Sequence, residues 1–267
     1  MVRPLAALLS ALALLLCSFP LAGACAEDVE ITPSVPYRKQ TYPPAGFEVA
    51  GVRLGMTGDE VKRRAAQADV KGSPVIETGT VGLSQDGLVV QARPYLQRIS
   101  MDIADGTSSL RVAFSSPSIG GRAVALDYAR TYFDAKTAPT LVEVFGQFEE
   151  RYGAGIVNRL TPPREMVTTE TWILDAEKTA RCAGGYCAAY EALSLGDMDR
   201  LRTSTSLGER VIVSVIVIAQ KEFPARARRV SVMIEDLTNE LLDLTEVQKQ
   251  LEAARASRSV PKLIEPR

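Results

Sequence analysis

The side chains that could do chemistry in this sequence are carboxylates, amines and phenols, because its 267 residues include no histidine. Without an imidazole the chain has no Ser-His-Asp or Cys-His nucleophile and no His-ligated metal site. Asp175 and Glu177 lie near Trp172 in the sequence, but two acids at one turn are not the opposed pair that a glycosidase needs. Trp172 itself is interpreted as a core residue. We therefore expect no cofactor and no metal ion, and a carboxylate-based enzyme is kept as the least favoured alternative.

The first 26 residues have the layout of a secretory signal peptide. A basic start precedes an apolar run over residues 5–16, which is shorter than a membrane-spanning helix. Residues 24–26, ACA, form an A-x-A cleavage site. Cys25 is alternatively the lipid-bearing first residue of an outer-membrane lipoprotein, although the lipobox leucine stands four positions before it instead of three. The sequence therefore predicts export to the periplasm, with a lipid anchor at Cys25 as the alternative.

Signal removal leaves two cysteines, Cys182 and Cys187, on either side of an Ala-Gly-Gly-Tyr turn. In an oxidising compartment this even pair predicts a local disulfide. Two thiolates alone do not complete a zinc site, and redox sites usually have the shorter Cys-x-x-Cys spacing. We expect the disulfide to staple a loop.

The charge of the chain argues for a protein partner rather than nucleic acid, since the formal net charge is only −1. Two basic clusters, at residues 62–64 and 226–229, are interpreted as a solvated helix face and a hairpin rim. An acidic or phosphate-bearing partner is the alternative interpretation of both clusters.

Two capping boxes, Thr57 with Glu60 and Thr140 with Glu143, each predict the start of a helix. Strand-like runs follow each helix, at residues 75–78, 98–103, 109–115 and 122–133, and then at residues 169–174, 187–195, 210–219 and 229–235. A last amphipathic helix is predicted from the spacing of Leu237, Leu241, Leu244 and Leu251.

The sequence thus predicts an α+β fold of two tandem modules, each a helix with a four-stranded antiparallel sheet, followed by a C-terminal amphipathic helix. The expected divisions are a signal peptide (1–26), a Pro-rich leader (27–46), a first module (47–134), a second module with the C-terminal helix (135–253) and a flexible tail (254–267).

Residues 51–57, GVRLGMT, followed by Glu60 and Val61, are similar to the G-M-T-x-x-E-V opening of small secreted α+β modules. These modules include the tandem-repeat β-lactamase inhibitory protein and the SmpA/OmlA (BamE-like) envelope lipoproteins. Residues 139–153 resemble the second helix of periplasmic proteins of unknown function that carry both motifs. The resemblance implies a helix packed on a four-stranded sheet and a habit of binding proteins, and it carries no catalytic residues.

From these features we expect an exported, non-enzymatic periplasmic protein that binds another envelope protein. The two modules could form one continuous or concave sheet surface for that partner. The alternatives are an outer-membrane lipoprotein with an envelope assembly or scaffold role and a carboxylate-based periplasmic enzyme.

Overall fold

The computed structural model describes residues 27–40, 47–67, 70, 72–85, 88–103, 106–160, 166–174, 198–206 and 210–259. The predicted signal peptide, Cys25, the Cys182–Cys187 pair, the acids Asp175 and Glu177, and the strand expected at residues 187–195 lie outside these ranges. Within the described part of the chain, no helix is both long and apolar enough to cross a membrane.

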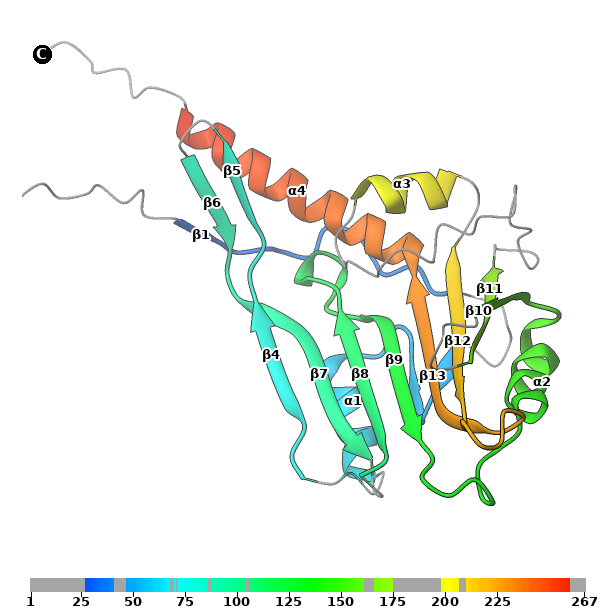
Figure 1. Cartoon of the computed structure of the whole chain (residues 1–267). Helices are drawn as coiled ribbons and strands as arrows, with labels where there is room; N and C mark the ends of the chain where they lie inside the picture. Colours follow the sequence, from blue (N-terminus) through cyan, green and yellow to red (C-terminus); the bar gives the residue numbers. More distant parts are fainter. Residues whose placement is uncertain are drawn as a thin grey trace, which may run out of the picture.

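One eight-stranded antiparallel sheet forms the body of the protein (Figure 1). Its strands lie in the order β10-β11-β12-β13-β9-β8-β7-β4. The strands are β4 (Val75–Gly79), β7 (Tyr95–Ile103), β8 (Ser108–Phe114), β9 (Ala123–Thr131), β10 (Ile156–Leu160), β11 (Val167–Leu174), β12 (Val211–Ala219) and β13 (Ala227–Asp236).

The seam between β9 and β13 makes this sheet continuous. Antiparallel pairing joins these two strands from Arg229 opposite Thr131 to Glu235 opposite Ala125. The prediction of two modules, each with its own four-stranded sheet, is therefore wrong. If the two halves were separate, β9 and β13 would each present a row of unpaired backbone groups, and their pairing satisfies both rows. The mixed helix and sheet content and the C-terminal helix are present.

Helices α1 (Gly58–Gln67) and α2 (Leu141–Tyr152) pack on the same face of the sheet. A cross-strand row on this face runs through six neighbouring strands, and each of its side chains is fully buried: Ile99, Val112, Leu126, Ile234, Val213 and Trp172. Alternation along each strand places these residues on one face. The prediction that Trp172 is a core residue is confirmed.

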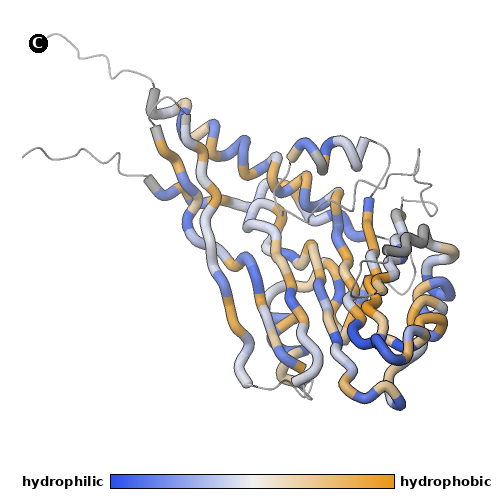
Figure 2. Tube along the Cα trace, in the orientation of Figure 1, coloured by the Kyte–Doolittle hydropathy of each residue, from blue (hydrophilic) through white to orange (hydrophobic). Residues whose placement is uncertain are grey.

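Helix α4 (Leu237–Ser259) crosses one end of the strands, with α3 (Met198–Ser206) beside it (Figure 1). Hydrophilic and hydrophobic residues alternate along its length (Figure 2). Of the four leucines that predicted this helix, Leu237 and Leu251 are buried and Leu241 and Leu244 are partly buried. The helix continues through Ser259, past the expected start of the tail at residue 254.

Two smaller sheets and a short helix complete the fold. Strand β1 (Glu27–Val29) pairs in parallel with β6 (Leu88–Ala92), which pairs with β5 (Gly82–Gln85), and β2 (Glu48–Val49) pairs with β3 (Val52–Arg53). The 3-10 helix η1 (Pro117–Ile119) lies between β8 and β9. A second apolar cluster joins β6 to α4 and to the residues after β1: Ile31, Val90, Ala92, Val247 and Leu251.

Candidate functional site

A groove of about 730 Å³ lies between residues 31–40, which we call the strap, and the turn that opens α1. Helix η1 and the residue before β9 border the groove as well. Apolar side chains and cations share its lining, which consists of Pro33, Ser34, Val35, Pro36, Tyr37, Lys39, Arg53, Leu54, Gly55, Met56, Glu60, Ile119, Gly120 and Arg122. Because separate segments of the chain meet here, we take this groove as the candidate functional site.

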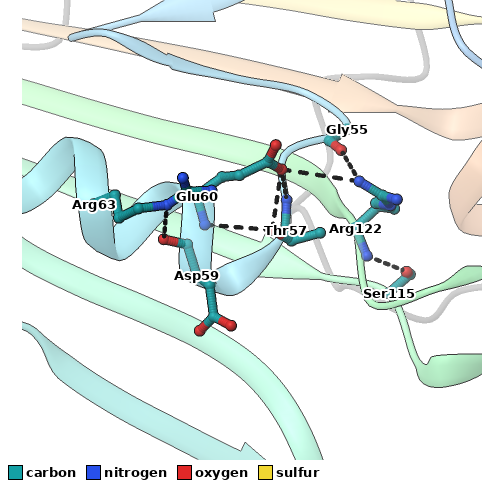
Figure 3. Close-up of polar contacts among 7 residues, drawn as sticks. All are labelled: Gly55, Thr57, Asp59, Glu60, Arg63, Ser115 and Arg122. Carbon is teal, nitrogen blue, oxygen red and sulfur yellow. Dashed lines mark hydrogen bonds and ion pairs between the residues drawn. The ribbon is translucent and has the colours of Figure 1, made fainter.

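The turn that opens α1 is fixed by a glycine and a capping box. Gly55 has a φ of +82°, and a Cβ there would lie 2.9 Å from the ring of Tyr37, so this position needs glycine. The Thr57 N–H donates to Glu60 Oε2 at 2.7 Å, and the Glu60 N–H donates to Thr57 Oγ1 at 3.3 Å (Figure 3). The first predicted capping box therefore forms, and it places Glu60 in the lining of the groove.

The second predicted capping box also forms, at the start of α2. The Thr140 N–H donates to Glu143 Oε2 at 2.7 Å, and the Glu143 N–H donates to Thr140 Oγ1 at 3.2 Å. The helix ends at Gly153, which has a positive φ and donates its N–H to Glu149 O. Neither capping residue of α2 lines the groove, so this box is a structural element.

Arg122 is held across the turn by contacts at both of its ends. Its backbone N–H donates to Ser115 Oγ at 2.9 Å, and its guanidinium donates to Gly55 O at 3.3 Å (Figure 3). The same guanidinium lies 3.8 Å from Glu60 Oε2. Arg122 is thus anchored to two segments, by its main chain at Ser115 and by its guanidinium at Gly55, and its side chain remains 39% exposed toward the groove.

Side-chain amides of α4 bind the main chain of the strap. Asn239 accepts from the Arg38 N–H at 2.8 Å and donates to Arg38 O at 2.8 Å. Gln250 accepts from the Thr32 N–H at 3.0 Å and donates to Thr32 O at 2.9 Å. Each amide therefore supplies the pair of hydrogen bonds that a neighbouring strand would make. Helix α4 therefore holds the strap at two points.

Two carboxylates, one at the end of β13 and one on α4, complete the attachment. Tyr37 donates its hydroxyl proton to Asp236 Oδ2 at 2.8 Å, and Ser34 donates to Glu246 Oε2 at 3.0 Å. Burial, followed by the charge of Asp236, raises the pKa of the Tyr37 phenol. The phenol is therefore a hydrogen-bond donor at neutral pH, and it fixes the strap as one wall of the groove.

The charge of the groove is positive. Lys39, Arg53 and Arg122 line it, and Glu60 is the one carboxylate among its lining residues. The hydrogen bond from the Thr57 N–H is the main cause that lowers the pKa of Glu60. Arg53 pairs with Glu48, whereas within the described part of the chain Lys39 forms no ion pair.

A smaller cavity of about 340 Å³ adjoins the groove and shares Met56 and Glu60 with it. Arg63 and Arg64, from the predicted basic cluster at residues 62–64, line this cavity. The two cavities together place cations on both sides of Glu60. An anionic ligand in the groove therefore meets several cations and one carboxylate that the capping box already engages.

The geometry of the groove supports binding better than proton-transfer catalysis. Its carboxylate accepts hydrogen bonds within the capping box and has no second carboxylate opposite it. A separate cavity of about 230 Å³ on the other face of the sheet contains Asp127 and Glu235, but Arg98 and Arg111 line the same cavity. Among the described residues, no cluster of acidic or cysteine side chains is arranged to hold a metal ion.

Four groove residues were missed by the sequence analysis: Tyr37, Lys39, Arg53 and Arg122. The strap was interpreted as a leader because its prolines show no apolar periodicity. A signal was present at the start of α4 and along it, where Asp236, directly before the helix, and Asn239, Asp243, Glu246 and Gln250, within it, follow each other at alternating steps of three and four. This spacing places five polar side chains on one helix face, and that face contacts the strap and the loop around η1.

Comparisons of this chain with protein-family models, with curated proteins and with solved structures found no match.

Proposed function

We propose that this chain is an exported, non-enzymatic protein that binds another protein of the cell envelope, and that its groove takes an extended acidic segment of that partner. The observation that carries the proposal is the lining of the groove, where Lys39, Arg53 and Arg122 lie among Pro36, Met56 and other apolar side chains. The export signal predicted over residues 1–26 supports the periplasm as the compartment of the protein.

An extended segment fits the groove better than a compact anion does. The three cations come from three separate segments: Lys39 from the strap, Arg53 from β3 and Arg122 from the residue before β9. Apolar residues between the cations favour a ligand that alternates carboxylates with apolar side chains. The exposed charges contribute mainly to orientation and association rate, and the apolar contacts contribute most of the affinity.

The experiment uses a fluorescent peptide that alternates Glu with Leu and Pro, together with the same peptide carrying Gln in place of Glu. We expect the full chain without its signal to bind the acidic peptide more tightly than the Gln peptide. Lys39→Glu should weaken binding of the acidic peptide, and the matched charge reversal Lys136→Glu, at an exposed position in the loop after β9, should not. Fluorescence anisotropy measures both effects.

Equal affinity for the two peptides, or equal binding by the two variants, would contradict an acidic partner. In a second experiment, a photocrosslinking amino acid replaces Pro36 and captures the natural partner from envelope extract. The crosslinked peptide of that partner should be rich in Asp and Glu. Tight binding of inorganic phosphate with no binding of the peptide would replace the protein partner by a small anion.

An outer-membrane lipoprotein with an assembly or scaffold role is the alternative, and it depends on Cys25. Labelling with a fatty-acid analogue separates the two proposals, since label at Cys25 supports the anchored form. The proposed Cys182–Cys187 disulfide predicts a two-proton mass deficit without reductant. Free thiols at both positions would exclude that staple.

A further inference from the structure

Three large apolar side chains are exposed on two neighbouring loops and the helix start beside them. Phe133 and Val142 are each 82% exposed, and Phe223 is 54% exposed. Phe133 follows β9, Val142 is in the first turn of α2, and Phe223 is in the turn between β12 and β13. Single exposed apolar residues are ordinary, but three on adjoining segments point to an interaction surface.

The two loops are joined by backbone hydrogen bonds, so this surface is a rigid platform. Leu141 N–H donates to Ala225 O at 3.0 Å, and Tyr132 N–H donates to Arg228 O at 2.7 Å. The guanidinium of Arg226 donates to Ala138 O. The platform therefore holds its apolar side chains outward without the loops having to become ordered when a partner binds.

Cations outnumber acids on the platform. Six basic residues lie on its loops and on the adjoining strand ends, and three of them belong to the basic cluster at residues 226–229. The six are Arg130, Lys136, Lys221, Arg226, Arg228 and Arg229. The acids on the same segments are Asp134, Glu143 and Glu222. The platform therefore carries an excess of positive charge, although the formal net charge of the whole chain is −1.

We propose that the platform carrying Phe133, Val142 and Phe223 binds the surface of a membrane rich in anionic lipid. Aromatic and aliphatic side chains that project from rigid loops insert at the level of the lipid headgroups, and adjacent Lys and Arg side chains pair with the lipid phosphates. The groove borders the strap, at the other end of the strands from these loops (Figure 1). A chain bound to the membrane in this way keeps its groove open to a partner.

The experiment is flotation of the full chain without its signal on vesicles of phosphatidylglycerol and phosphatidylcholine, compared with pure phosphatidylcholine. We expect binding to the anionic vesicles that weakens as salt is raised. The double variant Phe133→Ser with Phe223→Ser should bind at least about tenfold more weakly, because two exposed apolar side chains are lost. Lys221→Glu should weaken binding by about fivefold.

The matched control is Ile76→Ser, since Ile76 is also an exposed apolar residue but lies on β4, outside the platform. Its vesicle binding should equal that of the unaltered chain. Absence of binding to anionic vesicles, or equal binding by the double variant, would overturn the proposal. Capture of a protein through Phe133 without any vesicle binding would also overturn it. Lys39→Glu tests the groove alone and should leave vesicle binding unchanged, so the two proposals fail separately.

Discussion

The hydroxyl of Tyr37 lies 2.8 Å from Asp236 Oδ2, although the two residues are 199 positions apart in the chain. This contact links the strap to the first turn of α4. Asp236 also accepts from the Asn239 N–H at 3.0 Å, so the same carboxylate caps the helix and holds the strap. The wall of the groove and the start of α4 therefore depend on one buried side chain.

Tyr37→Phe should lower the free energy of unfolding by about 1–2 kcal/mol, because a hydrogen bond to a buried carboxyl group is lost. Urea denaturation measures the change. Tyr128→Phe is the control, since its hydroxyl lies 3.4 Å from Ser108 Oγ and makes a weaker contact. A loss for Tyr37→Phe no larger than that of the control would show that the contact with Asp236 contributes little.

Removal of both amide clamps, by Asn239→Ala with Gln250→Ala, should release the strap while the large sheet stays intact. Both side chains bind the main chain of the strap, and the sheet contact of Asn239 is with Asp236, at the very end of β13. Hydrogen exchange should rise at the amides of Thr32 and Arg38 and stay unchanged at β12. Binding of the acidic peptide should fall, because the strap is one wall of the groove. Protection of Arg38 equal to that in the unaltered chain would contradict the clamp.

Thr57→Ala and Thr140→Ala should each cost about 1 kcal/mol of stability, because each removes the acceptor of a helix cap. The corresponding serine variants keep the hydroxyl and should be nearly neutral. Only the Thr57 variant should also change peptide binding, since Thr57 positions Glu60 and the turn at the groove. Equal peptide binding by both alanine variants would show that this turn does not shape the site.

The stability of the chain should depend on pH through Asp243, which accepts hydrogen bonds from Ser116 and Ser118. Burial is the main cause that raises the pKa of Asp243 in the folded protein. The contribution of Asp243 to stability is therefore greatest below the unfolded pKa, near 3.9, and it declines as pH rises through the higher folded pKa. The stability advantage of the chain over Asp243→Asn should shrink as pH rises from the unfolded pKa through the higher folded pKa.

Glu143→Gln should show the opposite pH dependence when its free energy of unfolding is compared with that of the unaltered chain. The Thr140 N–H lowers the pKa of Glu143, so the stability from this carboxylate is present above its unfolded pKa and is lost as pH falls through the folded pKa. The advantage of the chain over Glu143→Gln should therefore grow with pH. If the stability difference changed with pH in the same direction for Asp243→Asn and Glu143→Gln, the opposite pKa shifts of the two carboxyl groups would be refuted.

Trp172 is the one tryptophan of the chain and reports on the core. It is fully buried, its indole N–H donates to Gly153 O at 2.7 Å, and Phe148 and Tyr152 lie beside its ring. We expect blue-shifted fluorescence that resists quenching by acrylamide and shifts red in one step on unfolding. Ready quenching under native conditions would contradict this burial.

The sequence predicted the elements whose signals are local. Both capping boxes fixed the starts of α1 and α2, because a cap needs only residues three positions apart. Strand-like runs located β7, β8, β9, β11, β12 and β13 to within a few residues. Their arrangement could not be predicted, since the β9–β13 pairing joins residues about one hundred positions apart and no local pattern specifies it.

The strap shows why the groove was missed as well. The two amide clamps bind main-chain atoms of Thr32 and Arg38, which any sequence provides, so no residue type in the strap marks these two contacts. The information lies on α4, in polar residues that occupy an interior-facing row. A search for amphipathic helices treats such a row as a solvated face, and the burial of Asp236, Asn239 and Asp243 shows that it is covered.

The distance along the chain between the strap and its clamps also sets an order of assembly. Arg38 is bound by a residue 201 positions later, and Thr32 by one 218 positions later. During synthesis the strap is made before every strand of the eight-stranded sheet, yet its binding surface on α4 is among the last parts to be made. Contacts of such long sequence separation form late in folding. The groove is therefore completed only when the whole body is in place, so an unfinished chain has no finished site to offer a partner.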